Sequence, residues 1–271
     1  MQLIGRPIGE IEMHPSRIEL FYWAAGLFLH VSLLFVLWTR HRATTFPFFT
    51  TLITANIVRS ITLYAIFHYG TRTAYFYSYM SFATLDFALQ LCVAYELASH
   101  VFCPTGTWAP DVRKPFVILV ILSIGIAAVL ASMPTPPEKT LLKALLDRMN
   151  LFSSALLCLL FVGMIRFSVT ARLPWKTHEA RIAQGLGFYS LLGILIAGGY
   201  TVIGEVRTSA FSQQLTLLRL TTYLMCLTYW IVMLWRDAPA PKELPEEMRR
   251  QLFTLQRRVQ YDLRRLRELK R

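Results

Sequence analysis

The sequence contains few charged residues for its length. Asp, Glu, Lys and Arg make up 16% of the 271 residues, whereas a soluble domain carries about a quarter, placed throughout the chain. The charges collect between apolar segments and after residue 235. The mean hydropathy is +0.44. This distribution argues against a soluble domain and favours a protein that resides in a membrane.

Cysteine is also scarce, with four in the whole chain. Cys92, Cys158 and Cys226 fall inside apolar segments, and Cys103 lies at the end of one. In the topology predicted below, no pair of them faces an oxidising compartment. We therefore expect neither a structural disulfide nor a zinc site.

Motifs of catalysis and of cofactor binding are missing. The chain has no nucleophile elbow, phosphate-binding glycine loop or metal-ligand cluster. A retinal protein needs a lysine in the last helix, and none lies between Arg207 and Arg236. Haem held by two histidines needs them at one depth, whereas His30, His68 and His100 lie at different depths. The sequence predicts no cofactor, no metal and no enzymatic activity.

What the sequence does contain is seven long apolar segments. About 20 helical residues cross a hydrocarbon core of about 30 Å. The segments lack strict two-residue alternation, which favours helices over a barrel. The predicted fold is all-α, a polytopic seven-transmembrane-helix bundle over 18–235, between an extracytoplasmic segment 1–17 and a cytoplasmic tail 236–271. The segments are 18–38, 48–69, 74–99, 116–132, 151–167, 183–204 and 215–235.

Lys and Arg set the predicted orientation. They gather in the tail and in the loops after the first, third and fifth segments, which places these parts in the cytoplasm. The N-terminus is then outside, and the first segment acts as the targeting signal because 1–17 lacks signal-peptide features. We predict the cell inner (plasma) membrane. The net charge of +12 reflects this bias, so we expect anionic lipid, and not nucleic acid, as its partner.

Several polar residues fall inside the apolar segments. An ionised side chain near the bilayer centre costs at least about 2.5 to 3.5 kcal/mol, so each needs a partner or a wet cavity. Arg59 and Asp86 have comparable depths on adjacent segments, and we predict that they pair. Asn56 matches Gln90 in depth, and Gln90 shares a helix face with Asp86.

The seventh segment carries a second polar stripe, which includes Arg219 and Tyr223. His30 lies midway along the first segment. We predict a polar cavity in the outer half of the bundle that binds a ligand or passes a solute. Its candidate residues are Arg59, Asp86, Gln90, Arg219, Tyr223, Asn56 and His30. The alternative is that these residues only fix helix register.

Two further features concern helix packing. Glu96 lies about two turns from the end of the third segment, and we predict that it pairs with Arg40 or Arg42 of the first loop. The sixth segment is rich in small residues, including Gly185 and Gly193. These favour close approach of neighbouring helices, with a flexible gating helix as the alternative.

The tail reads as one amphipathic helix over 246–271 after a proline-rich linker. Its basic face and apolar stripe favour the anionic inner leaflet or a cytoplasmic or membrane protein partner. A short coiled coil between two copies of the chain is the alternative. We expect no enzymatic output domain after the tail, so any signal would have to pass to another protein.

One resemblance supports this topology. The Tyr95-Glu96 pair, the Val101-Phe102-x-Pro104 exit from the third segment and a charged helical tail after seven spans resemble an uncharacterised family of bacterial seven-helix inner-membrane proteins. The resemblance implies the topology and brings no activity with it.

Three functions are compatible with these features. The leading hypothesis is a receptor-like or accessory membrane protein with a ligand in the outer cavity. The second is a small-solute transporter, because 70–76 echoes 204–211 as in a parallel repeat of three helices plus three, linked by a fourth. The third is a structural subunit of a larger membrane complex.

Overall fold

The computed structural model describes residues 17–102, 110–132, 141–170, 177–203 and 209–237. The chain divides into two units, Met1–Asp237 and Ala238–Arg271. The predicted N-terminal segment up to residue 16 and the predicted amphipathic tail from residue 238 lie outside the described residues. The first unit is described below.

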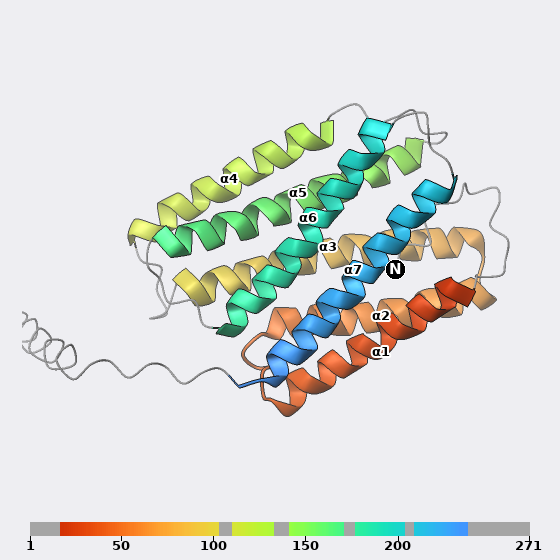
Figure 1. The fold of residues 1–271 in the computed structure, drawn as a ribbon, viewed down its shortest axis with the longest axis horizontal. Coiled ribbons are helices and arrows are strands. Elements are labelled where there is room, and N and C mark those ends of the chain that lie inside the picture. Colours follow the sequence, from red (N-terminus) through yellow and green to blue (C-terminus); the bar gives the residue numbers. More distant parts are fainter. Residues whose placement is uncertain (1–16, 103–109, 133–140, 171–176, 204–208, 238–271) are drawn as a thin grey trace, which may run out of the picture. The chain divides into compact units, whose positions relative to one another are not determined.

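The described residues form an all-helical bundle, as predicted (Figure 1). Each of the seven predicted apolar segments falls on one helix. The helices are α1 Arg17–Thr39, α2 Pro47–Tyr69, α3 Arg72–Phe102, α4 Pro110–Ser132, α5 Leu141–Thr170, α6 Thr177–Ile203 and α7 Ser209–Trp235.

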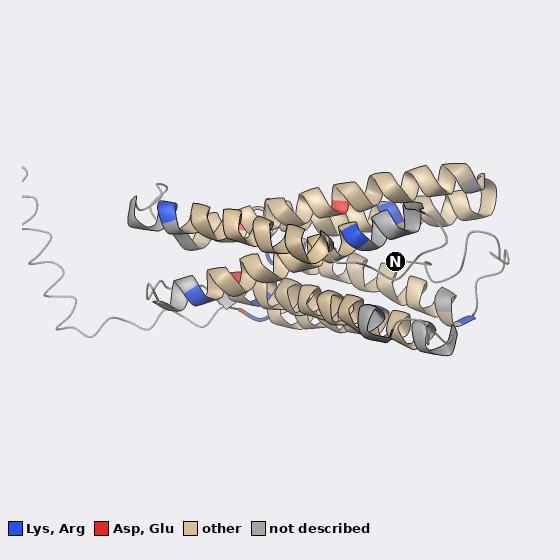
Figure 2. Ribbon diagram, turned by 90° about the horizontal axis from the view of Figure 1, so that it is seen from above, with Lys and Arg blue, Asp and Glu red and all other residues tan. Residues whose placement is uncertain are grey.

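Five of these helices are long and apolar enough to cross a membrane, which indicates a multi-pass membrane protein. Charged residues are sparse along the described ribbon (Figure 2). The apolar part of α4, Phe116–Ser132, is shorter, and α3 carries Asp86, Gln90 and Glu96 along its length. The prediction of seven spans is thus supported for five helices. The spans of those five are Leu20–Thr39, Pro47–Tyr69, Arg148–Arg166, His178–Gly198 and Gln214–Trp235.

Six helices pack side by side in a ring. The order of contacts is α1, α2, α3, α5, α6 and α7, and α7 returns to α1. The remaining helix, α4, packs on α5 at the edge of the bundle (Figure 1). Because α4 packs mainly on α5, the apolar side chains Ile118, Ile121 and Val129 stay exposed.

The bundle is tightly packed at one end. Its main apolar core comes from the ends of α1, α3, α5 and α7 and from the beginnings of α2 and α6. We call this end the packed half, and the end where α1, α3, α5 and α7 begin the cavity half. The largest fully buried side chains of this core are Phe49, Phe161, Leu33, Leu37, Ile53, Leu97, Leu157, Met164, Ile182, Leu227 and Leu234.

Glycines of α6 allow close helix contacts, as the small-residue pattern predicted. A Cβ atom added at Gly185 would collide with the indole of Trp230 on α7. One added at Gly193 would lie 2.6 Å from Ser154 Oγ on α5. In a membrane, where lipid is as apolar as the helices, such close packing replaces the hydrophobic effect as the force between helices.

Candidate functional site

A cavity of about 810 Å³ lies within the bundle and has residues of all seven helices in its wall. Along α7 its wall runs from Leu215 to Trp230. At 1.5 Å per helical residue this corresponds to a length of about 22 Å. The cavity occupies mainly the cavity half, and Leu52, Ile53 and Trp230 of the packed core form its floor.

The structure places the seven predicted site residues in the wall of this one cavity. They come from α1, α2, α3 and α7, which are distant in sequence. Their common place in one cavity wall agrees with the depth comparison made from the sequence. The residues are His30, Asn56, Arg59, Asp86, Gln90, Arg219 and Tyr223.

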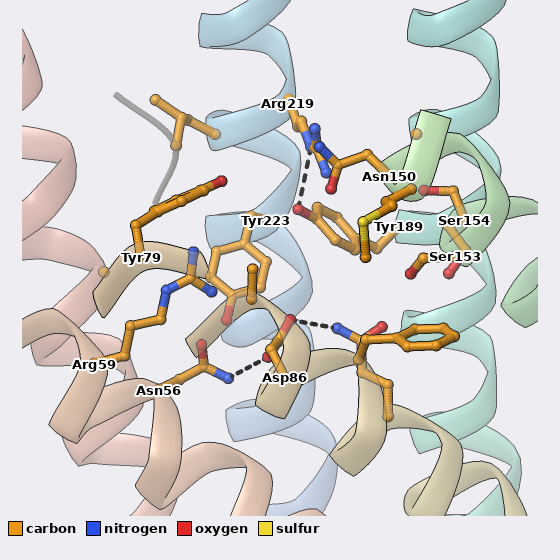
Figure 3. Close-up of a pocket in the computed structure, with 18 of the residues that line it drawn as sticks. Asn56, Arg59, Tyr79, Asp86, Asn150, Ser153, Ser154, Tyr189, Arg219 and Tyr223 are labelled. Atoms are coloured by element: carbon orange, nitrogen blue, oxygen red, sulfur yellow. Dashed lines mark hydrogen bonds between the residues drawn. The ribbon is translucent and has the colours of Figure 1, made fainter. Parts of the chain in front are cut away.

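The predicted ion pair between Arg59 and Asp86 is wrong. Within the described residues, the ion pairs shorter than 4.0 Å are both made by Asp237. The amide of Asn56 donates to Asp86 Oδ1 at 3.1 Å, and that of Gln90 donates to Asp86 Oδ2 at 2.7 Å (Figure 3). Both carboxylate oxygens accept a hydrogen bond from an uncharged amide, so Asp86 is satisfied without direct contact to Arg59.

Arg59 instead rests against an aromatic ring. Its guanidinium carbon lies 5.6 Å from the centroid of the Tyr79 ring, within the range of a cation–π interaction. Its Nε atom is buried and has no hydrogen-bond partner in the part of the chain that the structure describes. Asp86 therefore does not satisfy this buried N–H group of Arg59.

Arg219 is held in a similar way on the facing helix α7. Its Nε donates to the hydroxyl of Tyr189 at 3.3 Å, and its guanidinium carbon lies 5.8 Å from that ring. Figure 3 shows Arg59 beside Tyr79 and Arg219 beside Tyr189, with Tyr223 between the two pairs in this view. Each arginine is thus supported by a tyrosine of another helix.

His30 connects α1 to α7. Its Nδ1 donates to the carbonyl oxygen of Gly26 at 2.6 Å. In the neutral ring its Nε2 then accepts the hydroxyl of Tyr223, at 2.7 Å. Tyr22 and Thr221 add a second link between these helices, with 2.8 Å between their hydroxyl oxygens. Polar contacts therefore join α1 to α7 in the cavity half.

Several wall residues are absent from the predicted set. Tyr79 and Tyr189 support the arginines, and α5 contributes Arg148, Asn150 and Ser154. Asn150 and Ser154 are four residues apart, a spacing that places both on one face of α5 and could have revealed it. Tyr189 belongs to no polar stripe that the sequence shows.

The prediction for Glu96 is also wrong. Its two carboxylate oxygens accept the backbone N–H groups of Phe48 and Phe49, at 3.0 and 3.1 Å. These amides open α2 and have no partner within their own helix, and Pro47 at the first position has no N–H to satisfy. Glu96 therefore caps α2 from α3, and the positive end of the helix dipole favours its charge.

The two arginines expected to pair with Glu96 bind the end of α7 instead. Arg40 Nη1 lies 3.3 Å from Asp237 Oδ1, and Arg42 Nη2 lies 3.8 Å from the same oxygen. Arg42 Nη2 also donates to the carbonyl oxygen of Arg236 at 3.2 Å. Burial lowers the pKa of Arg42, opposed by the Asp237 carboxylate. The loop between α1 and α2 is thus fastened to the residues that follow α7.

The chemistry of the cavity is that of a binding site. Guanidinium, amide, phenol and imidazole groups can hold a polar ligand, and the apolar wall can hold a hydrocarbon part. No group of three His, Cys, Asp or Glu side chains suited to a metal ion occurs among the described residues. The chain matches no protein-family model, no curated protein and no solved structure.

Proposed function

We propose that this protein is a receptor-like or accessory membrane protein that binds a ligand in the cavity described above. The observation that carries the proposal is the convergence of Arg59, Asp86 and Arg219, from three helices, on one cavity of about 810 Å³. Charged groups inside membrane helices are costly, and those that face a polar cavity commonly mark a binding site or a solute pathway. The volume lies within the range of about 300 to 1,000 Å³ typical of small-molecule sites.

The proposed topology has the N-terminus outside and the tail in the cytoplasm of a cell inner membrane. The positive-inside distribution of Lys and Arg supports it. In this arrangement the cavity half faces outward, and the basic tail contacts anionic lipid or a protein partner. The resemblance to bacterial seven-helix inner-membrane proteins agrees with this topology.

The ligand site can be tested by a substitution that fills the cavity with a larger side chain. Ala83 lines the cavity, whereas Ala88 of the same helix is exposed and does not. Wild type, Ala83→Phe and Ala88→Phe are extracted from membranes in mild detergent and compared by native mass spectrometry. We expect a retained small molecule in wild type and Ala88→Phe and its loss in Ala83→Phe. Identical retention in all three proteins would contradict a ligand in this cavity.

A small-solute transporter is the second proposal. It is favoured by α4, which lies between α1–α3 and α5–α7 in chain order and packs at the edge of the bundle, as the linker of two three-helix repeats would. Reconstituted liposomes can separate the two functions. A transporter accumulates the molecule identified above inside the vesicles, and Asp86→Asn abolishes uptake. A receptor binds the molecule without uptake and changes the contact of its tail with a partner.

A structural subunit is the third proposal. It predicts that Arg59→Leu combined with Asp86→Leu leaves function intact, because the two charges would then serve only helix packing. Loss of ligand retention in this double variant, with the fold preserved by circular dichroism, would exclude that role.

A further inference from the structure

The wall of the cavity carries an excess of positive charge. Among the wall residues that the structure describes, Arg59, Arg148 and Arg219 stand against one carboxylate, that of Asp86. His30 Nδ1 donates to the carbonyl oxygen of Gly26 and Nε2 lies 2.7 Å from the Tyr223 hydroxyl, so both ring nitrogens already have a partner within the protein. In a medium of low dielectric constant this excess attracts an anion strongly.

Asp86 makes no direct ion pair with Arg59. Its oxygens are taken by Asn56 and Gln90, and Arg59 Nε stays buried without an acceptor among the described residues. An unsatisfied buried donor lowers stability. Arg59 lines the cavity and is partly exposed, and Figure 3 shows its guanidinium beside Tyr79 and Tyr223 in the pocket. An anionic ligand head can therefore bind the terminal N–H groups of Arg59, which makes Arg59 the best-defined anchor in the cavity.

Most of the remaining wall is apolar. Leu63 and Phe67 of α2, Phe87 of α3, and Leu186 and Ile196 of α6 belong to it. Along α7 the cavity extends over about 22 Å, from the level of Leu215 to that of Trp230. A small inorganic anion would leave this wall uncovered, whereas a hydrocarbon chain would fill it.

We propose that the cavity binds a single-chain amphiphilic anion, with its carboxylate or phosphate head at Arg59 and its chain along the apolar wall. This inference rests on the proposed function and specifies the ligand class. Arg219, held by Tyr189, supplies a second positive charge to the head. Such a molecule can come from the bilayer as a lysolipid or from solution as a fatty acid, and the shared chemistry is one anionic head on one chain.

The test uses the full chain in nanodiscs of zwitterionic lipid, with empty nanodiscs as background. The probes are dodecanoate, dodecyl phosphate, dodecanol, dodecyltrimethylammonium and inorganic phosphate. Binding is measured by equilibrium dialysis at about pH 8.5, far above the pKa of about 4 of a carboxyl group. We expect dodecanoate or dodecyl phosphate to bind at least about tenfold more tightly than dodecanol, as a charge-assisted hydrogen bond would give. The anion that binds more tightly indicates where the ligand comes from. Dodecyl phosphate would indicate a lysolipid of the bilayer, and dodecanoate would indicate a fatty acid from solution.

Variants then locate the head group. Arg59→Gln should weaken binding of the preferred anion about tenfold or more and leave dodecanol within about threefold. Arg59→Lys should retain part of the affinity because it keeps the charge. Arg17→Gln is the matched control, since Arg17 lies at the same end of the bundle, exposed and outside the cavity wall. It should change binding less than about twofold, as expected for a screened surface charge.

The outcomes separate this inference from the proposed function. Equal binding of dodecanol and both anions, abolished by Ala83→Phe, would overturn the anionic ligand and keep the ligand site. Tightest binding of dodecyltrimethylammonium, or of phosphate without a chain, would also overturn the inference. If no probe binds in a manner sensitive to Ala83→Phe and native mass spectrometry finds no retained molecule, the proposed function itself fails.

Discussion

The two halves of the bundle differ in how their buried polar groups are hydrogen-bonded. In the packed half, apolar side chains fill the interior, and the buried Glu96 is matched by two backbone N–H groups. In the cavity half, side chains line an open space, and Arg59 keeps an unmatched Nε. His178 and Arg42 are exceptions at the packed end, since both ring nitrogens of His178 and the Nε of Arg42 have no hydrogen-bond partner in the described part of the chain.

This difference indicates where stability and function reside. A buried charge that meets its hydrogen-bonding partners stabilises the fold, whereas one left partly unmatched costs free energy and remains available to a ligand. We therefore expect substitutions in the packed half to change stability, and substitutions of the cavity arginines to change binding.

The largest effect is expected at Glu96. Replacing it with alanine removes the cap from two α2 amides and should reduce the free energy of unfolding by about 3 kcal/mol. Glu96→Gln should cost less, because its amide oxygen still accepts one bond. Thermal unfolding in bicelles, followed by circular dichroism, measures both. If Glu96→Ala unfolds at the same midpoint temperature as the wild type, the cap does not contribute to stability.

A smaller effect is expected from two glycines of α6. Gly185→Ala forces a methyl group against Trp230, whose indole N–H is bound to the carbonyl of Arg181 at 3.3 Å, and overpacking costs about 1 to 3 kcal/mol. Gly198 lies toward the cavity half with no atom within 4 Å of an added Cβ. Gly198→Ala should therefore be neutral or stabilising by up to about 1 kcal/mol. Equal destabilisation by Gly185→Ala and Gly198→Ala would contradict the difference in packing between the two halves.

The smallest effect on stability is expected at Arg59. Arg59→Met removes a partly unmatched cation and keeps an unbranched chain, so the free energy of unfolding should change by less than about 1 kcal/mol in either direction. Binding of the anionic amphiphile should be lost in the same variant. A loss of several kcal/mol would instead assign Arg59 to the packing of the bundle.

Much of this architecture follows from residue patterns. Segments of about 20 apolar residues predicted the helices, and α3 departs from the apolar norm because Asp86, Gln90 and Glu96 interrupt it. Helical rise alone placed Arg59 and Asp86 at a common depth, which explains why both line one cavity. Their pairing was wrongly predicted because equal depth does not show which donor lies within hydrogen-bonding distance of the carboxylate.

The partner of Glu96 was beyond sequence reasoning for a different reason. Its oxygens bind backbone amides of Phe48 and Phe49, and backbone amides are present at every residue except proline. A sequence shows charges that could attract a carboxylate, such as Arg40 and Arg42, but not which helix end lies beside it. The support of Arg219 by Tyr189 is likewise a contact between helices that no stripe on α6 predicts.

The sequence by itself determined the helices, their apolar character and the set of polar residues that must avoid lipid, because these depend on local composition and on helical periodicity. Only the tertiary structure decided that one half of the bundle is packed with apolar side chains and that the other contains a cavity. It also decided that Asp86 accepts hydrogen bonds from two amides and makes no ion pair with Arg59. Those outcomes depend on which side chains of separate helices approach to within hydrogen-bonding distance, and that is a property of packing.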